Sequence, residues 1–328
     1  MTQHATQDPA HLAEYVLDSD SAGGRFLQIL GLGAAGRNVG QAYCACVSST
    51  LGLSLPGSGR RPKVPKLLVM MQSRALVLST KPGARLRYST LPASPEHGPF
   101  STTLLVFLNG LLLPRSSWIA AIDSLVATRS PQQRPVPHLL TYDRYGQGDS
   151  DPDPTDDPRS PYGHDARDVV ADLHRFLLEA CDAHLPASLD DMTVVFVANS
   201  IGCPLARLYA AEHPGRVSAY VFLDSMMANT DFVSLFPDPD APATLPAGIT
   251  VDELRKAREG YRRMFHPTVP NPEHFDRRNL PILLPEADGP QLPADPKNEN
   301  PYLIIVGHDP DEFAEQGETF NSPEKTVA

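Results

Sequence analysis

Residues 194–209 read VVFVANSIGCPLARLY, an apolar strand-like run that passes through a short turn into an apolar helix. The turn is Ala198-Asn199-Ser200-Ile201-Gly202, with small residues two positions before and two positions after the serine. A sharp strand–turn–helix bend needs small residues at both places because the chain packs tightly there. The bend also raises the serine at the positive N-terminal end of the helix. This pattern predicts a nucleophilic Ser200; the alternative is that Ser200 only caps the helix.

Strand-like and helix-like segments alternate on both sides of this turn. The predicted elements are a hairpin over 75–90, strands over 104–108 and 138–141, a helix over 165–180, a strand over 194–197, a helix over 201–212, and strands over 219–223 and 302–306. Short, continuously apolar runs are typical of strands buried on both faces. The alternation predicts an α/β protein with a mostly parallel central sheet flanked by helices.

Residues 226–300 interrupt this alternation with a proline-rich segment. It contains one clear helix, predicted over 251–265 after a capping box of Thr250 and Glu253. An insertion between two strands of a sheet predicts a helical cap or lid. Residues 1–70 show no sustained period and predict a flexible extension. We therefore expect an extension over 1–70, a core over 71–225, a cap over 226–300, and a last core strand with a short terminal piece over 301–328.

The strand over 104–108 ends in Asn109-Gly110-Leu111. A tight turn at this place can aim a backbone N–H at a reacting oxygen. With Ser200 as nucleophile, the N–H groups of Leu111 and Ile201 are the expected donors of an oxyanion hole. The alternative is an ordinary strand–helix turn. The residues expected to shape the two turns are Asn109, Gly110, Asn199 and Gly202.

From about residue 75 to 318 these segments resemble the α/β-hydrolase fold superfamily. Asn109-Gly110 with Trp118 is similar to its HG-x(n)-W oxyanion segment, and residues 198–202 are similar to its G-x-S-x-G elbow, with alanine at the first small position. Residues 142–150, YDRYGQGDS, resemble its YD-x-x-G-x-G-x-S loop. The chain is most similar to fungal-type members of unassigned substrate. A serine at the elbow argues against epoxide hydrolases and haloalkane dehalogenases, which resemble this fold but use aspartate there.

The resemblance implies a catalytic acid after the strand over 302–306 and then a histidine base. Asp309 is the expected acid, with Asp311 and Asp224 as alternatives, while helix capping is the other interpretation of Asp309 and Asp311. No histidine follows Asp309, and no earlier one is a clear base. The resemblance also implies a final strand beyond 302–306, so our simplest hypothesis is a C-terminally incomplete hydrolase. The earlier histidines considered are His164, His213, His266, His274 and His308.

Composition limits the classes of partner. The 328 residues carry a formal net charge of −11, which argues against nucleic acid because phosphate contacts need clustered Lys and Arg. No run reaches the roughly 18 apolar residues of a membrane span, and we find no secretory signal, so a cytoplasmic protein is expected. Neither a metal nor an organic cofactor is expected. The four cysteines are scattered, and Gly31, Gly33 and Gly36 lack the acidic partner that dinucleotide binding needs.

The expected function is that of a serine hydrolase acting on an ester or similar acyl bond of a small apolar substrate. Asp309 would orient the base. The large side chains of the cap would line the pocket or pack as the cap's own core; they are Phe232, Phe236, Tyr261, Met264 and Phe265. Because no terminal histidine is present, the competing hypothesis is a non-catalytic α/β-hydrolase-fold protein that binds a small ligand or partner. A third hypothesis, a nicotinamide-dependent enzyme, would rest on the glycines over 31–36 alone.

Overall fold

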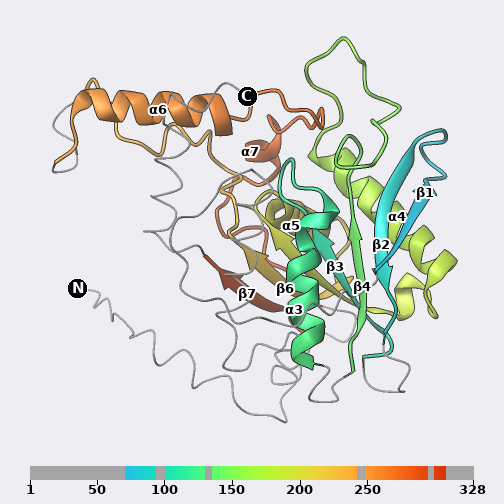
Figure 1. The fold of residues 1–328 in the computed structure, drawn as a ribbon. Coiled ribbons are helices and arrows are strands. Elements are labelled where there is room, and N and C mark those ends of the chain that lie inside the picture. Colours follow the sequence, from blue (N-terminus) through green and yellow to red (C-terminus); the bar gives the residue numbers. More distant parts are fainter. Residues whose placement is uncertain are drawn as a thin grey trace, which may run out of the picture.

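The computed structural model describes residues 71–93, 100–129, 135–241, 245, 248–294 and 299–307. The predicted extension over 1–70, with its glycine pattern, lies outside the described residues, as do His308, Asp309 and Asp311. Figure 1 shows the described elements as one central sheet with helices packed against it.

The sheet has seven strands in the order β1-β2-β4-β3-β5-β6-β7. The strands are β1 (Gln72–Val77), β2 (Arg85–Leu91), β3 (Thr103–Leu108), β4 (His138–Tyr142), β5 (Thr193–Asn199), β6 (Val217–Leu223) and β7 (Tyr302–Val306). β1 pairs antiparallel with β2, and β2 pairs antiparallel with β4, whereas the remaining pairs are parallel. The predicted mostly parallel sheet is confirmed.

Helices cover both faces of this sheet. α4 (Ala166–His184) and α5 (Gly202–Glu212) pack on one face, and α3 (Ile119–Arg129) packs on the other. β3 is buried on both faces because its side chains enter the two core clusters alternately, Leu104 and Val106 on one side and Leu105 and Phe107 on the other. The shorter described helices are η2 (Arg115–Trp118), η4 (Leu189–Asp191) and α7 (Leu280–Leu283). Of the helices that the structure describes, none combines the length and apolar character of a membrane span.

α6 (Val251–Phe265) has the bounds that its sequence predicts. The Thr250 hydroxyl accepts a hydrogen bond from the Glu253 N–H (3.2 Å), and the Glu253 carboxylate accepts one from the Thr250 N–H (2.9 Å). This reciprocal box satisfies donors that a helix N-terminus otherwise leaves unpaired. The start of α6 is therefore fixed by local sequence.

β1 lies three residues before its predicted place. The sequence predicts a strand over 75–80, but the N–H of Lys81 already closes a turn on the carbonyl of Leu78 at 3.0 Å. β1 is an edge strand with mostly exposed side chains, so its polar start at Gln72 leaves no apolar signal. α4 also continues one turn past its predicted end, to His184.

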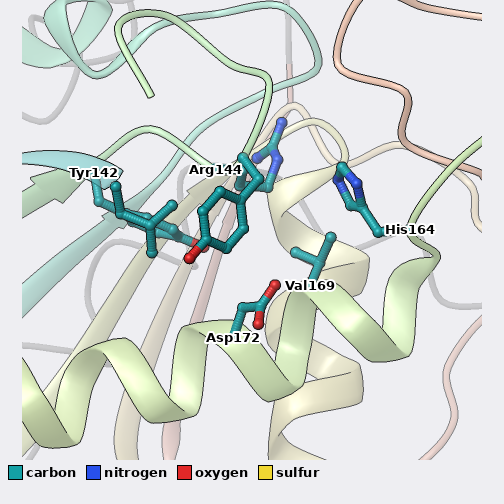
Figure 2. A pocket seen from close by; sticks show the side chains of 7 residues that line it. Tyr142, Arg144, His164, Val169 and Asp172 are labelled. Atoms are coloured by element: carbon teal, nitrogen blue, oxygen red, sulfur yellow. The ribbon is translucent and has the colours of Figure 1, made fainter. Parts of the chain in front are cut away.

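An ion-pair cluster fastens the β1–β2 turn to α4. The Lys81 ammonium lies 2.5 Å from the Asp153 carboxylate and 2.7 Å from that of Asp172, and the Asp172 side chain is 13% exposed. Burial raises the pKa of Asp172 to about 6, although the Lys81 charge opposes this. In Figure 2 Asp172 projects from α4 beside a small cavity. The folded state therefore binds the Asp172 proton more tightly than an unfolded chain does.

The pH dependence of stability tests this interpretation. A raised folded-state pKa contributes stability that is fully present below about pH 4 and is lost as the pH rises through about 6. We expect the free energy of unfolding of the wild type, minus that of Asp172→Asn, to fall by on the order of 2 kcal/mol between pH 4 and pH 7. Urea denaturation at intermediate pH values measures this difference. A difference that grows with pH would contradict the assignment.

Candidate active site

The turn between β5 and α5 holds Ser200 in a conformation that side chains rarely adopt. Ser200 has a φ of +49°, in the left-handed region that disfavours residues other than glycine. Its N–H donates to the carbonyl of Leu223 at the end of β6 (3.1 Å), and its carbonyl accepts from the N–H of Cys203 in α5 (3.1 Å). Such strain persists only where the surroundings over-determine the backbone, and it clusters at functional sites. Ser200 is half-buried at the carboxyl edge of the sheet.

The end of β3 packs so closely against this turn that two positions leave no space for a side chain. A Cβ at Gly202 would lie 2.6 Å from the carbonyl oxygen of Leu108. A Cβ at Gly110 would lie 2.7 Å from Oδ1 of Asn199 and 3.5 Å from Cβ of Ser200. The structure thus brings the predicted loop at Asn109-Gly110 directly beside the serine turn.

Asn109 and the loop after β4 share a buried hydrogen-bond network. The Asn109 amide donates to the carbonyl of Tyr142 (2.7 Å) and to Oε1 of Gln147 (2.9 Å), and its Oδ1 accepts from the Trp118 indole N–H (2.7 Å). Asn109 is 1% exposed and Trp118 is completely buried. Asn109 and Trp118, which the sequence analysis pairs as one segment, are therefore bonded to each other.

Two side chains of the loop after β4 hold the carbonyl groups at the end of β3. Arg144 donates through Nη1 to the carbonyl of Asn109 (2.8 Å) and through Nη2 to that of Gly110 (3.0 Å). Gln147 also donates to the Gly110 carbonyl, from Nε2 at 3.0 Å. Within the described residues, the N–H groups of Leu111 and Ile201 donate to no other protein group. These two N–H groups belong to the turns that follow β3 and β5.

Glu273 completes this network, although no sequence pattern predicts it. Its carboxylate accepts from Arg144 (2.9 Å), from Gln147 (2.9 Å) and from the N–H of Leu112, and the residue is 2% exposed. Glu273 lies in the proline-rich segment, with no periodic pattern or motif around it. Nothing in the sequence marks a contact between residues so far apart in the chain.

The described residues do not assemble a complete triad around Ser200. Asp224, at the end of β6, is exposed and has a φ of +48°. No described histidine lies within hydrogen-bonding distance of Ser200. His213 stacks on His174 with ring centroids 3.7 Å apart, and burial lowers the pKa of His213 to about 4. The ring of His266 is bonded to Thr268 Oγ1 at 2.7 Å.

A small cavity is lined by residues of β2, of β4, of the segment between β4 and α4, and of α4 itself. Figure 2 shows Tyr142, Arg144, His164, Val169 and Asp172 around it. It has room for about one water molecule. Buried polar atoms without a protein partner, Nε2 of His164 and the hydroxyl of Tyr145, belong to residues that line it. We therefore regard this cavity as a site for internal water.

Asp153, Asp156 and His164 bring three potential metal-ligand atoms within 4.8 Å of one another. These atoms already have protein partners. Asp153 accepts from Lys81 and from Thr155, and His164 Nδ1 lies 3.0 Å from the Asp156 carboxylate. Because an ammonium group already compensates the carboxylate charge, we assign no metal to this cluster.

Residues 105–326 match the model of the alpha/beta hydrolase family, more than half of the chain. The chain belongs to this family. Its fold class, predicted from the alternation and the motifs, is thereby confirmed. A search of curated proteins finds no match.

Several solved structures are similar to this alpha/beta hydrolase. Epoxide hydrolase A from Mycobacterium thermoresistibile has 16% identity and a TM-score of 0.40, with 79% of this chain and 99% of that one covered. An epoxide hydrolase from Vigna radiata has 12% identity and a TM-score of 0.39, with 76% and 96% covered. A soluble variant of monoglyceride lipase from Saccharomyces cerevisiae has 14% identity and a TM-score of 0.42, with 80% and 97% covered.

The close contact at Gly202 predicts that an alanine substitution there lowers the stability of the protein instead of raising it. Alanine in place of a helical glycine normally stabilises a protein by about 0.5–1 kcal/mol. At Gly202 the added Cβ would meet backbone atoms of Leu108 and Asn109, which cannot move aside. We expect Gly202→Ala to lower the free energy of unfolding by about 1–3 kcal/mol, measured by urea denaturation.

Gly307→Ala is the matched control, because a Cβ there meets open space. Its free energy of unfolding should stay within about 0.5 kcal/mol of the wild type. Equal unfolding midpoints for the two variants would contradict the close packing of β3 on the serine turn.

Proposed function

We propose that this alpha/beta hydrolase is a serine hydrolase that cleaves an ester or similar acyl bond of a small apolar substrate. The observation that carries the proposal is the strained Ser200, held beside the N–H groups of Leu111 and Ile201, which have no protein acceptor among the described residues. Strain at a half-buried hydroxyl residue costs stability, so its persistence points to a purpose other than packing. A nucleophile that must stand clear of its own strand and helix supplies that purpose.

The proposed reaction proceeds in two steps. Ser200 Oγ attacks the acyl carbon, its proton passes to a base, and the carbonyl oxygen becomes an anion that accepts hydrogen bonds from the N–H groups of Leu111 and Ile201. The C–O bond of the ester then breaks, and the alcohol leaves with the proton. Water next attacks the acyl-enzyme, which releases the acid and restores the Ser200 hydroxyl. Asp309 is proposed as the acid that orients the base.

The substrate class follows from the proposed cap over 226–300. Its large side chains pack on one another: the ring centroids of Phe236 and Tyr261 are 4.7 Å apart, and those of Tyr261 and Phe265 are 5.2 Å apart. Met264 and Phe265 are still 39% and 36% exposed. Exposed apolar side chains on the proposed cap suit a small apolar acyl compound better than a charged one.

One observation favours the second function, a non-catalytic protein that binds a small ligand or partner. A serine hydroxyl stays protonated without a base, and among the described residues no histidine contacts Ser200. Oxyanion donors alone give only a small residual rate. In that case the same two N–H groups would bind an acceptor oxygen of the ligand.

Labelling with a fluorophosphonate probe distinguishes the two functions. We expect the folded wild-type chain to be labelled and to hydrolyse a chromogenic short-chain ester. Both signals should fall by at least about 10³-fold in Ser200→Ala, because the acyl-enzyme can no longer form. Ser225→Ala is the control, since Ser225 is an exposed serine just after β6 whose hydroxyl donates to the carbonyl of Met226 (3.3 Å).

The control should keep the labelling and the hydrolysis of the wild type. If a demonstrably folded wild-type chain resists the probe, Ser200 is not activated, and the binding function replaces catalysis. Equal labelling of Ser200→Ala would assign the reactive group to another residue.

A further inference from the structure

We propose that Glu273 is a positioning residue that sets the direction of the Leu111 N–H, and that the segment over 226–300 thereby completes the oxyanion hole. The inference rests on the proposed function and names a residue that governs that same site. Glu273 itself does not touch the reacting atoms in this proposal. It acts through Arg144, Gln147 and the backbone of Leu112.

The orientation of one peptide plane is the first step. The carbonyl of Gly110 and the N–H of Leu111 belong to the same trans peptide, so they point in opposite directions. Arg144 Nη2 and Gln147 Nε2 both bond that carbonyl at 3.0 Å. The Leu111 N–H must therefore face away from these two side chains. Gly110, whose missing Cβ would lie 3.5 Å from Cβ of Ser200, keeps this peptide beside the serine.

Glu273 accepts hydrogen bonds from the two side chains that donate to the Gly110 carbonyl. Oε2 accepts from Arg144 Nη2 at 2.9 Å, and Oε1 accepts from Gln147 Nε2 at 2.9 Å and from the N–H of Leu112. The carboxylate thus contacts both side chains and the peptide that follows Leu111. Without the Glu273 carboxylate, the Arg144 guanidinium and the Gln147 amide would each lose a hydrogen-bond acceptor, and the Leu112 N–H would lose its acceptor.

The electrostatics of the site require an acid at this place. The side chains of Arg144 and Glu273 are 3% and 1% exposed, so the guanidinium charge is removed from water. Two backbone carbonyls supply dipoles but no compensating charge, and a buried unpaired charge is strongly destabilising. A carboxylate at 273 therefore lets the loop use an arginine, whose planar fork bonds two adjacent carbonyls at once.

The backbone of Glu273 is held in place by several neighbouring segments. Gly146 has a φ of +72°, and a Cβ there would lie 2.7 Å from the carbonyl oxygen of Glu273. The next residue, His274, has a φ of +56°, and its carbonyl accepts from the N–H of Gly163 at 2.8 Å. Phe275 is 1% exposed and stacks parallel to His164. A strained residue directly after Glu273 and close packing against its backbone suit a residue whose position matters.

The test compares Glu273→Gln with the wild type. Glutamine keeps the size of the side chain but offers one acceptor oxygen to three donors and removes the charge opposite Arg144. We expect kcat for a chromogenic ester to fall about 10- to 100-fold with KM within about twofold, somewhat less than the loss of an oxyanion donor outright. Hydrogen exchange of the Leu112 amide should accelerate about tenfold or more, because a hydrogen bond to a buried carboxylate is lost.

A control for stability alone is Asp153→Asn, which removes a buried carboxylate from the Lys81 cluster and leaves the Asn109–Leu112 loop untouched. It should lose stability but keep the kcat and the Leu112 exchange rate of the wild type. Gln147→Met is the second variant, in case Glu273→Gln does not fold. It should lower kcat less, because Arg144 still bonds the Gly110 carbonyl.

Unchanged kcat in both Glu273→Gln and Gln147→Met would overturn the proposal, as would faster Leu112 exchange at full activity. The proposal would also be overturned if Asp153→Asn lowered kcat as much as Glu273→Gln does at an equal loss of stability. If the wild type is inactive, the proposed function fails by itself. The exchange rate of Leu112 then decides separately whether Glu273 holds the loop, with an unchanged rate counting against it.

Discussion

The buried charge of Arg144 is the constraint on which the site depends. Its guanidinium is removed from water, so each N–H needs an acceptor and the charge needs an acid. The acceptors are carbonyls at the end of β3, and the acid is Glu273. Removing one partner of such a pair typically costs about 3–5 kcal/mol. The loop after β3, the loop after β4 and the segment after β6 are therefore bound to one another as a unit.

The second constraint is the absence of side chains where this unit meets the serine turn. Leu108 of β3 pairs with Ala198 of β5, so the two strands end at the same level. Parallel strands bring their carboxyl ends to one edge, where α/β proteins place their ligands. Glycine at 110 and 202 lets the two chain reversals touch.

The sequence predicts the features that depend on local pattern. The buried strands β3, β5 and β6, the box of α6 and the bend at Ser200 follow from apolar runs, capping residues and small residues, and the structure has each of them. β1 was misplaced because an exposed edge strand carries no apolar alternation. Glu273 was missed for a different reason: a buried ion pair between distant residues depends on tertiary packing, and neither partner carries a local signal of it.

The position of α5 limits which described histidines could act as the base for the proposed nucleophile Ser200. α5 spans 11 residues, which is about 16 Å at 1.5 Å per residue, with Ser200 before its first residue and His213 after its last. His213 and its stacking partner His174 therefore lie at the wrong end of the helix. Of the described histidines that follow Ser200 in the chain, this leaves His266 and His274, both in the segment over 226–300. His274 is the neighbour of Glu273 and shares its fixed backbone. A base drawn from this part of the chain would make one segment responsible both for orienting the oxyanion donor and for removing the serine proton.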